Sequence, residues 1–121
     1  MKILRRKLKN AHVSWRAVVT LWHEEISFRI QAIAGLVVFV LSYVLGITKT
    51  EFLIVVLTVG SVLAVEALNT AIEELCDHVT PSEHPKIGKI KDLGSGASLL
   101  IGIAALIVGC VIFIPPILGL L

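Results

Sequence analysis

Residues 52–77, FLIVVLTVGSVLAVEALNTAIEELCD, decide how this chain folds, because polar side chains interrupt a long apolar run at regular spacing. Glu66, Asn69, Glu73 and Asp77 recur every three or four residues, so on an α-helix they share one narrow face, here named the polar stripe. Most of the other side chains in this run are Val, Leu, Ile and Ala. Carboxylates at membrane depth are energetically costly and usually face a bundle interior, a cavity or a functional site. The stretch therefore predicts a transmembrane helix with a polar site along one side.

The composition on both sides of this helix indicates a membrane protein. The chain has 121 residues, of which 56% are hydrophobic, and a mean hydropathy of +0.93. Three segments, 30–47, 52–75 and 94–118, are apolar enough to be spans, and about 20 helical residues cross an apolar core. We expect one all-α integral membrane domain over 1–121, in which residues 1–29 form a surface helix and a junction.

The cations predict the orientation of the spans. Lysines and arginines cluster in residues 1–29, and three lysines lie in the segment 75–92, which we expect to be a loop. Positively charged flanks stay cytoplasmic, so the N-terminus and this loop are expected on the cytoplasmic side of a membrane that the chain crosses three times. The net charge of +2 is small and argues against a nucleic-acid partner.

Residues 4–24 have helical periodicity without enough apolar side chains to span a membrane. Ala11, Trp15, Val18 and Trp22 build one apolar face, and basic residues lie away from it. This pattern is typical of an amphipathic helix that lies in the membrane interface, with tryptophans as anchors.

Small residues recur at the start of the third span. Gly94, Ser98 and Gly102 are spaced by four residues, a pattern that allows helix backbones to approach closely in membranes. We interpret the row as a packing surface, with direct ligand contact as the alternative.

Charged residues should converge at the cytoplasmic ends of the three spans. Glu25 precedes the first span, the polar stripe lies on the second, and Lys91 and Asp92 precede the third. Carboxylates near a lysine suit Mg²⁺ and a nucleotide: Glu25 and Glu73 can hold metal, Lys91 can neutralise phosphate, and Glu66 can accept a proton. The same residues also fit a proton-coupled carrier or a polar packing network.

The motif Glu66-Ala-Leu-Asn-Thr-Ala-Ile-Glu73-x-x-x-Asp77 closely resembles the signature of the small prokaryotic integral-membrane diacylglycerol kinases. That family includes the undecaprenol kinases of Gram-positive bacteria. Further matches, in the same order, are Ser14-Trp15, Glu25-x-x-Phe28-Arg29 and Lys91-Asp-x-Gly-Ser95.

The resemblance implies a homotrimer in the bacterial plasma (inner) membrane, with active sites between subunits, which phosphorylates a membrane lipid alcohol with ATP and Mg²⁺. Residues 80–85 of this chain are similar to the undecaprenol kinases, and Lys91–Ser95 to the diacylglycerol kinases. The resemblance therefore leaves open which lipid alcohol accepts the phosphate. A non-enzymatic membrane carrier or scaffold is the alternative function. The implied roles are catalysis by Glu66 and Asn69; metal binding by Glu25 and Glu73; nucleotide binding by Arg6, Ser14, Glu25, Glu73, Asp77, Glu83, His84, Lys91 and Asp92; and lipid binding by Trp22, Arg29, Glu66 and Ser95.

Overall fold

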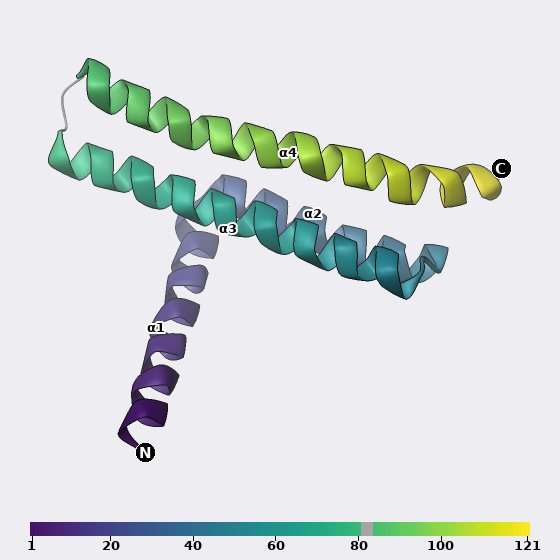
Figure 1. Ribbon diagram of the computed structural model, residues 1–121, viewed down its shortest axis with the longest axis horizontal. Helices are drawn as coiled ribbons and strands as arrows, with labels where there is room; N and C mark the ends of the chain where they lie inside the picture. The colour runs from purple at the N-terminus through teal and green to yellow at the C-terminus, as the bar shows by residue number, and fades with distance from the viewer. Residues whose placement is uncertain (81–83) are drawn as a thin grey trace.

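The computed structural model describes residues 1–80 and 84–121, and throughout these ranges the regular structure is α-helical. The helices are α1 (Lys2–Glu24), α2 (Ile26–Leu45), α3 (Lys49–Val79) and α4 (Pro85–Gly119). Helices α2, α3 and α4 run alongside one another, and α1 leaves this bundle at a steep angle (Figure 1). The predicted all-α class is therefore confirmed, and α2, α3 and α4 are each long and apolar enough to cross a membrane.

A short turn makes α2 and α3 an antiparallel hairpin (Figure 1). Gly46 ends α2 with φ +64°, a left-handed conformation that glycine adopts without steric cost. Thr48 then starts α3 with a capping box: its hydroxyl accepts from the Glu51 N–H at 3.1 Å, and the Glu51 carboxylate accepts from the Thr48 N–H at 3.0 Å.

The expected loop over residues 75–92 is wrong for most of its length. Helix α3 continues to Val79, and α4 begins at Pro85, so the charged residues 86–92 are helical. Proline is favoured in the first turn of a helix because its missing N–H would have no intrahelical partner there. The His84 ring caps the same end, where its Nδ1 accepts from the Lys86 N–H at 3.2 Å. Most of the segment therefore belongs to two long helices.

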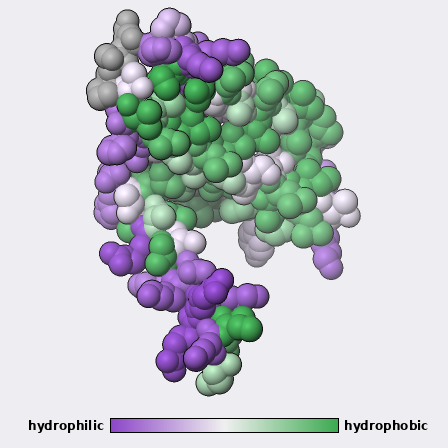
Figure 2. Space-filling model, turned by 60° about the vertical axis from the view of Figure 1, so that its left-hand side comes forward, coloured by the Kyte–Doolittle hydropathy of each residue, from purple (hydrophilic) through white to green (hydrophobic). Residues whose placement is uncertain are grey.

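The chain buries little of its apolar surface against itself. Among the described residues, only four apolar side chains are buried: Phe28, Val55, Cys76 and Ile112. Figure 2 shows a hydrophobic surface over the bundle, with hydrophilic side chains gathered on α1 and along one edge. Such a surface suits a lipid environment, where no hydrophobic driving force pushes apolar side chains inward.

The helix pairs differ in how closely they pack. Helices α3 and α4 have the most extensive contact, and α2 touches α4 much less. Where α2 crosses α3, a methyl group at Gly35 would lie 2.7 Å from a Val59 methyl carbon, so the missing side chain sets how near these helices come. This contact also fixes their antiparallel register.

Candidate active site on helix α3

The polar stripe occupies the half of α3 that follows Val62. Glu66, Asn69 and Glu73 are partly buried, and Asp77 is exposed. The Asn69 amide Nδ2 donates to the Glu73 Oε1 at 3.3 Å, which joins two members of the stripe across one helical turn. The side chains of the stripe are thus most exposed at the end of α3. At a rise of about 1.5 Å per residue, Glu66 lies about 10 Å from Glu73 along the helix axis.

Helix α4 closes on the stripe at Gly94. This glycine is buried, and a methyl group added to it would overlap the amide oxygen of Asn69. The Asn69 Oδ1 is itself buried, with no hydrogen-bond partner in the described part of the chain. Gly102 has nothing near its missing side chain within the same described part, so the predicted packing row makes close contact at Gly94 but not at Gly102.

An ion pair ties the exposed end of the stripe to α4. The Lys91 ammonium lies 2.5 Å from the Asp77 Oδ1, with the two side chains 38% and 65% exposed. Lys91 precedes the apolar segment that begins at Gly94, and its hydrogen bond to Asp77 raises the pKa of its ammonium above the ordinary value. Lys91 is therefore a fixed positive charge at this end of the site.

Glu25 lies at the corner between α1 and α2. Its extended backbone, with φ −112° and ψ 108°, separates the two helices, and its side chain makes no capping hydrogen bond. Gly35 of α2 lies against Val59 of α3. Glu25 comes before Gly35 by the same number of residues as Asn69 comes after Val59, so in the antiparallel hairpin Glu25 is level with Asn69. The three helices thus bring Glu25, Asn69 and Gly94 to one depth.

No group of three or more His, Cys, Asp or Glu side chains suited to a metal ion occurs among residues 1–80 and 84–121. A magnesium ion at one or two carboxylates takes its other ligands from substrate phosphates and water. The donor set of one chain therefore fits a metal carried in with a nucleotide, not a metal cage built from protein alone.

The remaining predicted residues are more scattered. Arg6, Ser14 and Trp22 are exposed on α1, which packs mainly on α2 and not on the stripe. His84, Asp92 and Ser95 are exposed on or beside α4, and Arg29 is partly buried with an Nε that has no hydrogen-bond partner in the described ranges. Glu83 lies outside the described residues. A single chain thus brings Lys91 to the stripe and places Glu25 level with it. Arg6, Ser14 and Trp22 on α1 lie apart from the stripe.

Two further polar groups lie near Glu66: Gln31, which sequence reasoning missed, and Ser98, which it named only as a member of the row of small residues. The Gln31 Oε1 on α2 and the Ser98 Oγ on α4 are both buried, without a hydrogen-bond partner in residues 1–80 and 84–121. The close approach of Gly94 to Asn69 places Ser98 level with the residue before Glu66. The sequence feature that could have identified them is a neutral polar side chain inside an apolar span, because burying such a side chain costs free energy unless it is hydrogen-bonded.

Three long apolar helices, one of which carries carboxylates and an amide along one face, define a small helical membrane protein. Residues 12–113 match the family model described as prokaryotic diacylglycerol kinase. The chain is 33% identical to the diacylglycerol kinase of Escherichia coli (strain K12) over 107 residues, which cover 88% of each chain. It is 32% identical to the undecaprenol kinase of Bacillus subtilis (strain 168) over 91 residues, covering 75% of this chain and 74% of the relative. The chain belongs to the prokaryotic diacylglycerol kinase family and is a bacterial membrane protein.

Proposed function

We propose that this protein is a lipid kinase that transfers the γ-phosphoryl group of ATP to the hydroxyl of a membrane lipid alcohol. The observation that carries the proposal is the partly buried stripe of α3, ending at the Lys91–Asp77 pair, inside the region that matches the family. A non-enzymatic carrier or scaffold is not favoured, because relatives that match most of the chain are named as kinases.

Glu66 is the general base in this proposal. It is the deepest carboxylate of the stripe, where the hydroxyl of a membrane-embedded alcohol can reach it. As the lipid oxygen attacks the γ-phosphorus, its proton moves to Glu66. The new oxygen–phosphorus bond forms while the bond to the β–γ bridging oxygen breaks, and ADP leaves. Asn69 positions the site, since its amide already holds Glu73.

Glu25 and Glu73 are the residues that would hold Mg²⁺ in this site. Glu25 is free of any capping role and level with Asn69, and Asn69 fixes one oxygen of Glu73. A Mg²⁺ ion bound there would neutralise charge on the transferred phosphoryl group. Lys91 adds a second positive charge, which Asp77 orients, and Asp92 and His84 contribute nucleotide contacts from α4.

The acceptor is diacylglycerol or undecaprenol, the alcohols that the names of the two relatives indicate. In this proposal Arg29, Ser95 and Trp22 contact the lipid; Ser95 and Trp22 are exposed, and Arg29 is partly buried. The shared chemical requirement is one hydroxyl within reach of Glu66.

The working form is proposed to be a homotrimer with a cytoplasmic N-terminus. The chain buries only four apolar side chains among its described residues, and α1, which carries Arg6 and Ser14, leaves the bundle at a steep angle (Figure 1). A neighbouring subunit can bring these residues to the stripe. Helix α1 then lies in the cytoplasmic interface, with Trp15 and Trp22 as anchors and its basic residues near lipid headgroups.

The experiment is a kinase assay with both alcohols side by side. Purified protein in mixed micelles is supplied with labelled ATP, Mg²⁺ and either diacylglycerol or undecaprenol. The proposal expects Mg²⁺-dependent label in at least one lipid phosphate. Absence of label from both lipids, in protein that remains folded by circular dichroism, would contradict the proposal.

A further inference from the structure

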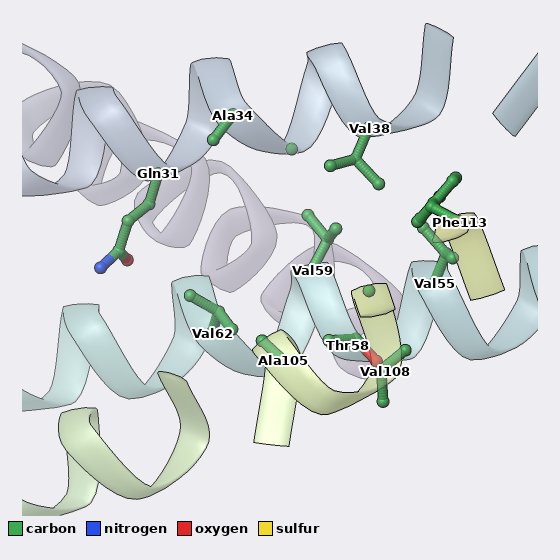
Figure 3. Close-up of a pocket in the computed structure, with 12 residues that line it drawn as sticks. Gln31, Ala34, Val38, Val55, Thr58, Val59, Val62, Ala105, Val108 and Phe113 are labelled. Carbon is green, nitrogen blue, oxygen red and sulfur yellow. The ribbon is translucent and has the colours of Figure 1, made fainter. Parts of the chain in front are cut away.

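Two hydroxyl groups inside the apolar spans are satisfied by their own helices. The Ser42 hydroxyl of α2 donates to the Val38 carbonyl at 2.8 Å. The Thr58 hydroxyl of α3 donates to the Ile54 carbonyl, also at 2.8 Å, and Thr58 does so at the wall of an apolar groove between α2, α3 and α4 (Figure 3). A serine or threonine in an apolar span can therefore be satisfied without any partner outside its own helix.

Ser98 of α4 departs from this pattern. Its Oγ is buried and has no hydrogen-bond partner in the described part of the chain, although its own helix offers the Gly94 carbonyl four residues earlier. A buried hydroxyl without a partner costs free energy. The Ser98 hydroxyl is thus a donor that is free to bind a group on another helix.

The packing of α4 on α3 places Ser98 beside Glu66. Gly94 lies so close to Asn69 that an added methyl group would overlap the Asn69 amide oxygen. Ser98 follows Gly94 by one turn on the same face of α4, and Glu66 precedes Asn69 by one turn on the same face of α3. Because the two helices are antiparallel (Figure 1), Ser98 and Glu66 lie about 1.5 Å apart in level along the axis.

The two partly buried carboxylates of the polar stripe differ in how they are held. Glu73 accepts a hydrogen bond from the Asn69 amide at 3.3 Å. No side-chain hydrogen bond among residues 1–80 and 84–121 reaches Glu66. A free glutamate samples several rotamers, whereas a general base must stay within hydrogen-bond reach of the proton that it accepts. The proposed base therefore lacks the kind of anchor that Glu73 has.

We propose that Ser98 is a positioning residue for Glu66, whose carboxylate accepts a hydrogen bond from the Ser98 hydroxyl in the reacting complex. This inference rests on the proposed kinase function. An ionised carboxylate has two oxygens, so one can accept from Ser98 while the other faces the lipid hydroxyl and takes its proton. Ser98 then holds the base as Asn69 holds the proposed metal ligand Glu73.

The Asn69 amide oxygen is the competing acceptor, since it too is buried without a partner in the described residues. It lies against Gly94, which is about 6 Å from Ser98 along the axis of α4. Glu66 is nearer in level, and hydrogen bonds to an ionised carboxylate are stronger than those to an amide. The two acceptors predict different losses, because Asn69 is joined to the proposed metal ligand Glu73 and Glu66 is the proposed base.

The test compares Ser98→Ala with Ser42→Ala, which removes a buried but satisfied hydroxyl from α2. Each variant is assayed with labelled ATP, Mg²⁺ and diacylglycerol or undecaprenol, whichever the wild type phosphorylates. For Ser98→Ala we expect kcat to fall about tenfold, the effect of one lost hydrogen bond to a charged group, while the KM values for lipid and ATP change less than about threefold. Ser42→Ala should change none of these values by more than about threefold.

Ser98→Thr separates the role of the hydroxyl from that of packing. Threonine keeps the donor, so kcat should stay within about threefold of the wild-type value. An equal fall in the Ala and Thr variants would assign Ser98 to packing and overturn the proposal. An unchanged kcat in Ser98→Ala would overturn it as well.

Binding of Mn²⁺ with a non-hydrolysable ATP analogue separates the two acceptors. We expect Ser98→Ala to bind this complex within about twofold of the wild-type affinity, because the hydrogen bond between Asn69 and Glu73 is untouched. A larger loss would assign Ser98 to Asn69, and a raised lipid KM would assign it to direct lipid binding; either result overturns the proposal. If folded wild-type protein phosphorylates neither alcohol, the kinase function itself fails and the inference falls with it.

Discussion

One face of α3 carries two different environments. Its first half, Val55 to Val62, borders an apolar groove that α2 and α4 leave open. Its second half, Glu66 to Glu73, is polar, and α4 closes on it through the missing side chain of Gly94. Both halves have a close helix contact, at Gly35 on the apolar half and at Gly94 on the polar half, so the two halves differ in the open groove and in the polarity of their side chains.

In the proposed function this difference lets a single helix serve two substrates of unlike polarity. The lipid alcohol is proposed to approach along the apolar half, and the metal–nucleotide complex from the exposed end, where Asp77 holds Lys91. Glu66 stands at the boundary between these halves. Breaking the boundary itself should therefore have larger effects than changing either end.

The largest effect is expected from Glu66→Gln. The amide keeps the size of the side chain but cannot accept the proton of the lipid hydroxyl, so kcat should fall by about 10²- to 10⁴-fold. Steady-state phosphorylation of lipid in micelles measures this change. Retention of full turnover would show that Glu66 is not the base.

Gly94→Ala should have the next largest effect, because the new methyl group overlaps the Asn69 amide oxygen and must displace it. A displacement of about 1 Å in a positioning group can lower kcat by about 10²-fold. Gly102→Ala is the matched control, since its methyl group enters open space in the described structure. Equal activities in the two variants would contradict a role for the close contact between α3 and α4.

Asp77→Asn should have a smaller effect, at the exposed end of the stripe. It removes the partner that raises the pKa of Lys91, and that pKa then returns toward its ordinary value of 10.5. Lys91 stays protonated at neutral pH in both cases, so the pH profile between about 6 and 8 should not move. We expect the KM for ATP to rise about fivefold or less, because an exposed ion pair orients a side chain only weakly. A loss as large as that of Glu66→Gln would show that Asp77 takes part directly.

The smallest effect on activity is expected from Thr48→Ala, in the turn at the apolar end. Loss of the capping box should lower the free energy of unfolding by about 1 kcal/mol, with lipid kinase activity unchanged. Thermal unfolding in detergent measures the first value, and Thr50→Ala, outside the box, is the control. A fall in kcat at equal folded fraction would link the outer turn to the site.

The helical class and the stripe could be predicted from the sequence because both depend on helical periodicity, and the family could be predicted because the motif from Glu66 to Asp77 resembles its signature. The prediction for residues 75–92 was wrong for most of the segment, since charge alone does not separate a loop from the exposed first turns of a helix that continues into an apolar span. Spacing could not distinguish Gly94 from Gly102, because only tertiary packing brings Asn69 to one of them. Gln31 gives almost no signal, because a single neutral amide barely changes the hydropathy of a span and its unpaired state depends on where α3 and α4 lie.

The central claim is that α3 separates a lipid end at Glu66 from a metal–nucleotide end at Glu73. Binding of Mn²⁺ with a non-hydrolysable ATP analogue, followed by electron paramagnetic resonance, tests it most directly in the wild type, Glu66→Gln and Glu73→Gln. The account predicts that Glu66→Gln binds the metal–nucleotide complex as the wild type does, and that Glu73→Gln loses at least about tenfold in affinity. Equal loss in both variants, or loss in Glu66→Gln alone, would contradict it.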